Sequence, residues 1–435
     1  MADNRIENSE KEITHIAGTY VVDAMPSFLN GGGISKKTED RNYTVVKTFQ
    51  DGTTNEGDRR PYNVVFVSAQ SVRRMLRDTL IQETNWPDSQ IRALHNNAEG
   101  NTDKVGGEFD PITYAEDDAF GYMLTKKGSG KLKVQEGVEV EGKGEDEESG
   151  EPEEGTRVKT VSRTSPLATS ILVGLRKDGW EGRDQAYVGL VEGSSQPYKT
   201  QFANTPMQGI FCLNYKRLGL FSNVGDKVEL GEDIINKYLD EKRLVELPQQ
   251  SQSQYFSLEK ETVEVKETKG KNKGRTVKKE IFKQIKKYGK MYEIANAKEK
   301  RKERASALIK ALAVLRGGAK QAAFETDVSP KVLIMAGLTC GNPIFNTIFE
   351  DDSTGRTRGK TVTINVATLK EIVNDYKDRI CTPVFIGIRT GFIKNEEEVR
   401  KLSQEGYIIT TPVGAAQRMA ENLPGKSSPE TVIPH

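Results

Sequence analysis

Apolar residues along this chain recur with the periods of strands and helices, and long polar stretches separate them. Apolar runs that alternate or are rich in β-branched residues predict strands. Spacings of three and four residues predict helices that bury one face. We expect strands at 14–24, 63–67, 168–175, 331–337 and 383–388, hairpins over 186–220, and helices at 67–80, 232–247, 305–315 and 369–376. This order favours one α+β domain over residues 1–435, built on an antiparallel sheet with large insertions.

The expected helix at 67–80 has an unusual polar face. Ser68 is placed to cap the helix, directly after the strand at 63–67. An apolar stripe formed by Val72, Met75, Leu76 and Leu80 predicts the buried side. The opposite stripe holds an amide and three guanidinium groups at positions i, i+3, i+4 and i+7, namely Gln70, Arg73, Arg74 and Arg77.

Two interpretations of this stripe stay open from the residues alone. No carboxylate at i+4 is expected to neutralise it, because Asp78 lies at its edge. A helix N-terminus attracts anions, and Arg73 and Arg77 would extend that attraction into a track for successive phosphates. A charged face exposed to water explains the same residues equally well.

Charge is distributed unevenly, although the formal net charge is only +1. Residues 135–154 contain ten acids and one lysine, within a Gly/Glu-rich segment, 128–155, that we interpret as a disordered insertion. Residues 266–304 contain sixteen Lys or Arg and five acids, within a basic insertion at 263–304. We expect this insertion to be loop-like at first and helical from Lys278. Its aromatic residues, Phe282, Tyr288 and Tyr292, interleave with cations, as is typical of proteins that bind single-stranded nucleic acid.

A second candidate for nucleic-acid contact follows the helix at 305–315. Gly317 and Gly318 let the backbone approach a phosphate or base closely, and Lys320 and Gln321 add a charge and an amide. A plain glycine cap of the helix is the alternative. The tail at 422–435 has no core pattern and is expected to be flexible.

The sequence argues against several other classes of protein. The three cysteines lie far apart and form neither a disulfide framework nor a zinc motif, and no long apolar run predicts a membrane span, so we expect a cytoplasmic protein. Two glycine-lysine stretches, 128–131 and 355–361, lack the spacing and the following helix of a phosphate loop. The acids Glu116, Asp117 and Asp118 are one candidate metal site, but an acidic turn in water is the commoner case. We expect no catalytic residue, metal or cofactor.

Several stretches resemble one family when taken together. They are YVVDAMPSFLNGGG, RNYTVVKTF, VSAQSVRRMLRDTL, NTDKVGGEFDPI, EDDAFGYML, SRTSPLATSILVGL, NTPMQGIFCLNYKRLGLFSNVGD and RGGAKQ. In this order they resemble the DevR-type (Cst-two) branch of the Cas-seven superfamily, the backbone subunit of type I-B CRISPR Cascade. The resemblance runs from about residue 14 to 341, and the chain after Gly341 adds little to it.

This resemblance implies a fold and a role. The fold is a modified RNA-recognition-motif (ferredoxin-like) palm with finger insertions and a thumb β-hairpin. The role is non-catalytic: copies polymerise head to tail along the spacer of the guide RNA (crRNA) and present it for pairing with target DNA. The implied partners are crRNA, target DNA through the guide, further copies of the chain, and Cascade subunits of the Cas-five, Cas-six, Cas-eight and small-subunit types, with no membrane.

The family's RNA contacts transfer onto individual residues of this sequence. The phosphate-binding helix matches Ser68, Gln70, Arg73 and Arg77, with Arg74 at the edge of the stripe. The loop after the first strand matches Asn30 and Gly31, and the glycine loop matches Gly317, Gly318, Lys320 and Gln321. The thumb is placed within 183–220, with Tyr198 and the base wedge Phe202, and Arg163 is a further candidate.

Two rival functions remain. One is a transcriptional autoregulator, which would bind duplex DNA without a guide. The other is a metal-dependent ribonuclease, by analogy with type III backbone subunits, which cut target RNA with an Asp in a loop. Asp23 and Asp40 flank the first loop, but neither lies in a motif that indicates catalysis.

Overall fold

The computed structural model describes most of the chain outside its long polar insertions. The described residues are 12–34, 43–54, 61–89, 92–95, 102–106, 109–124, 160–176, 179–191, 193–225, 227–248, 254–266, 276–351 and 362–425. The acidic insertion at 128–155, both phosphate-loop look-alikes, residues 267–275 of the basic insertion and the tail from 426 onward lie outside these ranges.

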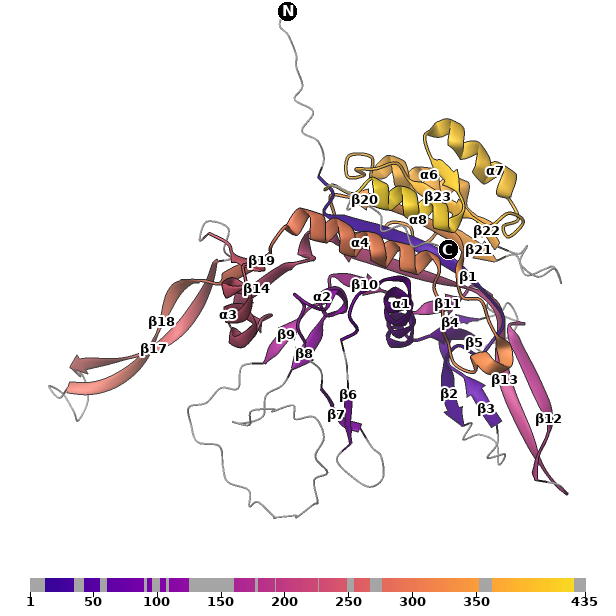
Figure 1. Ribbon diagram of the computed structural model, residues 1–435, viewed down its shortest axis with the longest axis horizontal. Coiled ribbons are helices and arrows are strands. Elements are labelled where there is room, and N and C mark those ends of the chain that lie inside the picture. The colour runs from indigo at the N-terminus through magenta and orange to yellow at the C-terminus, as the bar shows by residue number, and fades with distance from the viewer. Residues whose placement is uncertain are drawn as a thin grey trace, which may run out of the picture.

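Strands from both halves of the chain form the largest sheet, and helices cover it, so the fold is mixed α/β (Figure 1). Its main path runs β24-β23-β20-β1-β13-β11-β5-β4, and β2, β3, β10 and β12 pair at its sides. The twelve strands are β1 (His15–Ser27), β2 (Gly31–Ile34), β3 (Tyr43–Val46), β4 (Thr48–Thr54), β5 (Pro61–Val67), β10 (Leu167–Thr169), β11 (Leu172–Gly174), β12 (Glu181–Val191), β13 (Ser194–Asn214), β20 (Pro330–Leu338), β23 (Phe385–Ile388) and β24 (Ile408–Thr410).

The centre of this sheet has a simple order. β1 pairs antiparallel with β13 on one side and with β20 on the other, and β11 pairs antiparallel with β13. Helix α1 (Ala69–Glu83) lies in the chain between β1 and β11, and helix α4 (Ala297–Ala313) lies between β13 and β20. The chain therefore makes a β-α-β-β-α-β path whose sheet order is 4-1-3-2.

Each face of the sheet has its own core. Helices α1, α4 and α8 (Pro412–Glu421) pack on one face, where Leu76, Leu308 and Met419 are almost fully buried. The other face packs against the C-terminal part of the chain, with α6 (Val366–Asp375), α7 (Glu396–Lys401) and the 3-10 helix η3 (Leu402–Glu405). Residues after Gly341 therefore complete the fold, although they contribute little to the family resemblance.

A smaller sheet lies beside the first, in the order β16-β19-β14-β15-β9-β8. Its own core contains Phe221, Tyr238 and Tyr292. Its strands are β8 (Tyr122–Leu124), β9 (Val161–Arg163), β14 (Leu220–Val224), β15 (Lys227–Val228), β16 (Leu244–Glu246) and β19 (Lys290–Ile294), and the adjacent helices are α2 (Ala115–Phe120), α3 (Glu232–Asp240) and the 3-10 helix η1 (Tyr215–Arg217). The remaining pairs are β6 (Arg92–His95) with β7 (Thr102–Gly106) and β21 (Phe349–Asp351) with β22 (Val362–Ile364).

Two long hairpins project from the body at opposite ends of Figure 1. One is β12–β13, which overlaps the range expected for hairpins and begins five residues before it. The other is β17 (Gln254–Lys266) with β18 (Thr276–Tyr288), so the helix expected from Lys278 is wrong. Val277, Ile281 and Ile285 are spaced by four, which satisfies the period of a helix and of a strand alike, and the pairing with β17 decides between them.

Most other elements confirm the sequence pattern, with shifted ends. The strands β1, β5, β20 and β23 and helices α1 and α6 lie where we expected them. The strand expected at 168–175 is divided into β10 and β11 around Ser170, whose Oγ accepts a hydrogen bond from the N–H of Ile210. The start of the expected flexible tail is ordered, because Leu423 is buried in the core.

Candidate nucleic-acid interface

Helix α1 begins and buries its apolar face as the sequence predicted. The Oγ of Ser68 accepts a hydrogen bond from the N–H of Ser71, which is the expected cap. Val72, Met75, Leu76 and Leu80 are buried on the side that faces the core. The polar stripe therefore faces away from that core, and its neighbours determine what it can bind.

Arg73 is half-buried and bound to the protein backbone, contrary to the prediction of an open arginine stripe. Its guanidinium donates hydrogen bonds to the backbone oxygens of Leu167, at 2.7 Å, and Phe120, at 2.5 Å, and to Ser165 Oγ at 3.1 Å. It also lies 5.3 Å from the centroid of the Phe120 ring. Burial and the nearby Arg77 lower the pKa of Arg73. These contacts fix α1 to the segment around β10, so Arg73 is committed to the fold.

Arg77 is neutralised, because acids far away in the sequence reach it. Its Nε donates to Glu116 Oε2 at 2.5 Å, its Nη2 lies 3.6 Å from Asp117 Oδ1, and only 15% of its side chain is exposed. Arg74 also pairs with a carboxylate, that of Asp78, at 2.8 Å. The expectation that no carboxylate neutralises the stripe is therefore wrong: Asp78, four residues after Arg74 on the same helix, pairs with Arg74, and α2 supplies the acids that pair with Arg77.

The acidic cluster on α2 is buried and paired with arginines, so the acidic turn in water is also wrong. Glu116, Asp117 and Asp118 are at most 1% exposed. Asp118 accepts hydrogen bonds from Arg163 and from Arg304, which belong to β9 and α4. Among the described residues no group of three or more His, Cys, Asp or Glu side chains is arranged to hold a metal ion. The cluster joins α1, α4 and the smaller sheet.

Arg163 is therefore a poor candidate for RNA contact. Its side chain is fully buried and donates to the backbone oxygens of Asp118, Leu220 and Arg217. It also pairs with Glu229 at 3.4 Å and lies 4.3 Å from the centroid of the Phe221 ring. A guanidinium with this many internal partners serves the fold.

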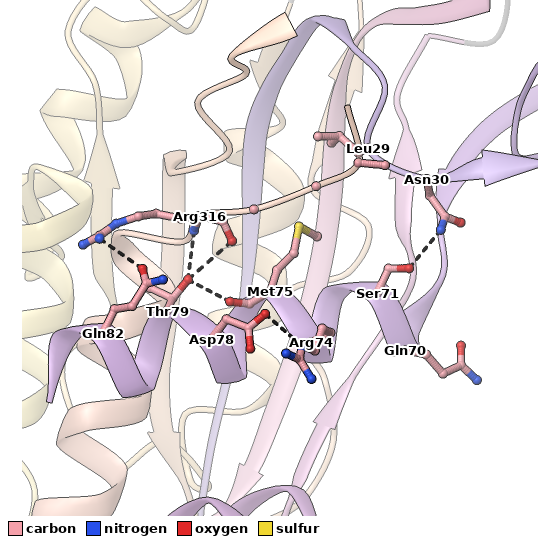
Figure 2. Close-up of a pocket in the computed structure, with 13 residues that line it drawn as sticks. Leu29, Asn30, Gln70, Ser71, Arg74, Met75, Asp78, Thr79, Gln82 and Arg316 are labelled. Atoms are coloured by element: carbon pink, nitrogen blue, oxygen red, sulfur yellow. Dashed lines mark hydrogen bonds and ion pairs between the residues drawn. The ribbon is translucent and has the colours of Figure 1, made fainter. Parts of the chain in front are cut away.

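An open groove runs along the outer side of α1, between the helix and the chain that follows α4 (Figure 2). Its volume is about 630 Å³. Polar side chains of α1 at successive turns form one wall, and a glycine loop, 316–319, forms the other. The lining residues are Leu29, Asn30, Gln70, Ser71, Arg74, Met75, Asp78, Thr79, Gln82, Arg316, Gly317, Gly318 and Ala319.

The glycine loop is fixed at both ends. The N–H of Arg316 donates to Thr79 Oγ1 at 3.0 Å, and the N–H of Ala319 donates to the backbone oxygen of Leu29 at 3.1 Å. Between these anchors, no hydrogen bond from the N–H of Gly317 or Gly318 occurs within the described chain. Two free donors in a fixed loop form a site suited to an anionic oxygen.

The close approach of loop and helix requires glycine. Gly317 and Gly318 have φ angles of 118° and 114°, which other residues rarely adopt. A Cβ on Gly317 would lie 2.8 Å from Met75 Cγ, and one on Gly318 would lie 2.6 Å from Leu29 Cδ2. The structure shows a close approach of this loop to Met75 of α1 and to Leu29. Its contact with RNA stays a prediction.

The cations of the groove are only loosely held by their partners. Arg74 has 71% of its side chain exposed and pairs with Asp78, which is 46% exposed. Arg316 has 55% exposed, pairs with Glu83, and donates to Gln82 Oε1 at 3.3 Å. Exposed pairs of this kind contribute about 1 kcal/mol or less. A phosphate that enters the groove can therefore take over either guanidinium at little cost.

At one end of the groove, Asn30 links β1 and α1. Its Nδ2 donates to Ser71 Oγ at 2.9 Å, and Ser71 Oγ lies 3.0 Å from Ser68 Oγ. The Oδ1 of Asn30 is buried without a partner in the described chain. Gly31 is exposed and pairs with Val46 at the start of β2. Asn30 therefore sets the position of the helix start relative to the loop.

Lys320 and Gln321 have different roles. Gln321 Nε2 donates to the backbone oxygen of Gly317, and Gln321 Oε1 accepts from the N–H of Thr326, so this amide shapes the loop. It begins the short helix α5 (Gln321–Phe324). Lys320 is exposed, and its Nζ lies 4.7 Å from the centroid of the Phe28 ring and 3.3 Å from Thr200 Oγ1 on β13. Lys320 therefore joins the glycine loop to the long hairpin.

Of the hairpin residues predicted to contact RNA, Phe202 lies at the base, opposite Gly182, and Tyr198 lies midway along, opposite Ala186. Phe202 is half-buried and packs 5.7 Å from Phe324, measured between ring centroids. The Tyr198 hydroxyl donates to Asp184 Oδ2 at 3.1 Å. Farther along β12, Tyr187 is 74% exposed and the sequence analysis did not single it out. Phe202 is thus packed against its own subunit, and Tyr187 is the more accessible aromatic.

The structure brings together Asn30, Gln70, Arg74, Gly317 and Gly318 from the predicted set. Arg77 and Arg163 instead pair with the buried acids of α2, and Arg73 is half-buried against the chain around β10. Arg316 and Gln82 were missed. Gln82 continues the four-residue spacing of Gln70, Arg74 and Asp78, a signal that the sequence contained. Arg316 lies directly before the two glycines.

Comparisons with known proteins place few limits on function. No family model matches the chain, and no curated protein matches it. Among solved structures, a chain of a CRISPR RNA-guided surveillance complex is similar with a TM-score of 0.40 and 9% identity, over 94% of this chain and 99% of that one. A chain of such a complex in a pre-nicking state has a TM-score of 0.43 and 10% identity, over 94% and 100%. Within the described residues, no helix is long and apolar enough to cross a membrane.

Proposed function

We propose that this protein is a non-catalytic, guide-RNA-binding backbone subunit of a type I-B Cascade-like effector, of the DevR-type branch of the Cas-seven superfamily. Copies bind head to tail along the crRNA spacer and present it for pairing with target DNA. The proposal rests on the collinear motifs of the sequence together with one structural feature, the groove between α1 and the glycine loop.

The groove carries the proposal because its chemistry suits a nucleic-acid backbone. Gln70 and Arg74 repeat along α1 at one-turn intervals, and the loop that forms the other wall contains two N–H groups, of Gly317 and Gly318, that make no hydrogen bond within the described chain. Guanidinium groups, amides and backbone N–H groups are the donors that contact phosphate without reading sequence. A subunit that accepts any spacer needs this kind of contact, since base pairing then reads the target.

The strand order supports an RNA-recognition-motif-like palm. The order β20-β1-β13-β11, with α1 and α4 as the connecting helices, is the order of that ferredoxin-like fold. On this palm, β12–β13 is the proposed thumb. It extends from the large sheet, and Lys320, directly after the glycine loop, contacts it at Thr200 on β13. Finger insertions correspond to β2–β3 and β17–β18.

The direct test is to sequence RNA that co-purifies with the tagged protein, co-expressed with a CRISPR array and the candidate Cas-five, Cas-six, Cas-eight and small subunits. The test variant is Arg74→Glu/Arg316→Glu, because both side chains are exposed and neither is needed by the core. The matched control is Arg418→Glu on α8, where Arg418 is 64% exposed and pairs with Glu421 three residues on.

Spacer-length RNA in the wild type and the control, and its loss from the groove variant with an unchanged unfolding midpoint, would support the proposal. RNA loading that is equal in all three would overturn the role of the groove. Binding of duplex DNA without a guide would favour the autoregulator, and Mg²⁺-dependent cleavage of a bound target RNA would favour the ribonuclease.

A further inference from the structure

A second surface continues from the groove onto the edge of the large sheet. The N–H of Lys47 donates to the backbone oxygen of Asn30 at 3.1 Å, and the N–H of Phe66 donates to the backbone oxygen of Lys47 at 3.0 Å. Asn30 lines the groove. The chain at Lys47, between β3 and β4, is therefore adjacent to the end of the groove at which α1 begins.

This surface contains an exposed aromatic pair with a cation. Phe49 on β4 is 37% exposed, and its ring lies edge-on to Phe66 of β5, with centroids 5.6 Å apart. The Lys47 ammonium lies 5.7 Å from the centroid of the Phe66 ring. Lys47, Phe49 and Phe66 share one side of the β4–β5 ladder because Phe49 pairs with Val64, two residues before Phe66.

The other side of this ladder belongs to the core. Val65 and Val67 of β5 pack in the core under α1. β4 is the last strand of the sheet, so its outer edge has no neighbouring strand among the described residues. A large aromatic ring at such an edge costs free energy when it faces water, unless a partner covers it.

We propose that Lys47, Phe49 and Phe66, here called the edge patch, form a base-stacking site for single-stranded nucleic acid. One base of a strand that leaves the groove at Asn30 stacks on Phe49, and Lys47 contacts its adjacent phosphate. The proposal rests on the proposed function for the identity of the strand. The chemistry is that of single-strand binders, in which a π-face holds a base of any sequence and a nearby cation holds the backbone.

The test separates stacking from phosphate contact. Binding of a fluorescent 12-nucleotide RNA is compared with binding of an abasic oligonucleotide of the same length and charge. Phe49→Leu keeps an apolar side chain against Phe66 but removes the π-face, and Phe49→Trp restores it. Val413→Ala on α8, where Val413 is 41% exposed, controls for the loss of an exposed apolar side chain.

We expect Phe49→Leu to weaken binding of the RNA by roughly ten-fold, within the range of one stacked base, and to leave binding of the abasic strand unchanged. Phe49→Trp should bind as the wild type does, and an RNA carrying 5-bromouridine should photo-crosslink at the edge patch. Equal binding by Phe49→Leu and the wild type, while Arg74→Glu/Arg316→Glu still loses both strands, would overturn the edge patch alone. If the wild type binds neither strand, the proposed function fails and the edge patch fails with it.

Discussion

Arg77 on α1 and Glu116 on α2 form a largely buried ion pair, with 2.5 Å between Nε and Oε2. The two residues lie 39 positions apart in the chain and belong to different helices. This pair turns one of the four residues of the predicted RNA-binding stripe into an internal contact. Arg74 directly follows Arg73 in the helix, so its side chain points in a different direction, and it stays exposed at the groove.

Arg77 and Arg74 should therefore differ sharply when each is replaced by alanine. Arg77→Ala leaves the Glu116 carboxylate buried without its partner, so we expect a loss of roughly 3–5 kcal/mol in the free energy of unfolding. Arg74→Ala should cost less than about 1 kcal/mol, because its pair with Asp78 is exposed. Urea unfolding of both variants measures the difference, and equal stabilities would contradict the buried network.

Asp117 should give the buried acidic cluster a measurable pH dependence. Burial raises the pKa of this carboxyl from 3.8 to about 6, against the hydrogen bond from Ser89 and the charge of Arg77, which lower it. The folded state then binds a proton more tightly than the unfolded chain. The stability from this group is present below about pH 4 and is lost as the pH rises through 6.

The variant Asp117→Asn tests this directly, because an amide resembles the protonated acid. Relative to the wild type, it should gain stability as the pH rises from 4 to 7, by up to roughly 3 kcal/mol, the equivalent of the raised pKa. Unfolding curves at several pH values measure the difference in the free energy of unfolding between the variant and the wild type. The contributions of the other titrating groups are common to both proteins and cancel in this difference. A difference that stays constant with pH would argue against the raised pKa.

Local patterns predicted the secondary structure around the site better than they predicted its partners. The cap at Ser68 and the buried face of α1 follow from residues within one helix, so the sequence contains all that is needed. The neutralisation of Arg77 depends on α2, and the contacts of Arg73 depend on the chain around β10. Such pairings result from tertiary packing, so the spacing of residues within one helix cannot predict them.

The same limit explains the misplaced candidates. Arg163 lies in a motif of the family resemblance, but a motif alone does not distinguish an arginine that binds RNA from one that stabilises the core. In the structure, Arg163 bonds to four segments of the chain. The two adjacent glycines at 317 and 318 indicated a close backbone approach by themselves, and the structure shows one to Met75 and Leu29, while contact with RNA stays a prediction. At the C-terminal end, strong apolar runs predicted β20 and β23, whereas α7, β24 and α8 were not predicted.

Gly317 should tolerate substitution poorly. Gly317→Ala combines an unfavourable φ of 118° with a contact to Met75, so it should lower stability by about 1–3 kcal/mol and displace the loop. Gly391→Ala is the control, since its φ is 80° but nothing lies within 4 Å of the added Cβ. Thermal unfolding compares them. RNA loading should fall only for Gly317→Ala, and a larger effect of Gly391→Ala would count against the close approach.

Salt dependence should identify which arginine contacts phosphate. A side chain that neutralises one phosphate of a single strand contributes about 0.7 to the slope of log Kobs against log salt concentration. Arg74→Gln should therefore reduce the steepness of that slope by about 0.7, and the same change at Arg418, an exposed arginine on α8, should leave it unaltered. Arg77→Gln is the informative third variant. Because Arg77 is bound to Glu116 inside the protein, it should weaken folding without changing the slope measured on the folded fraction. A slope reduced by Arg77→Gln and not by Arg74→Gln would mean that RNA displaces α2 from the arginine stripe and that the groove is not the phosphate site.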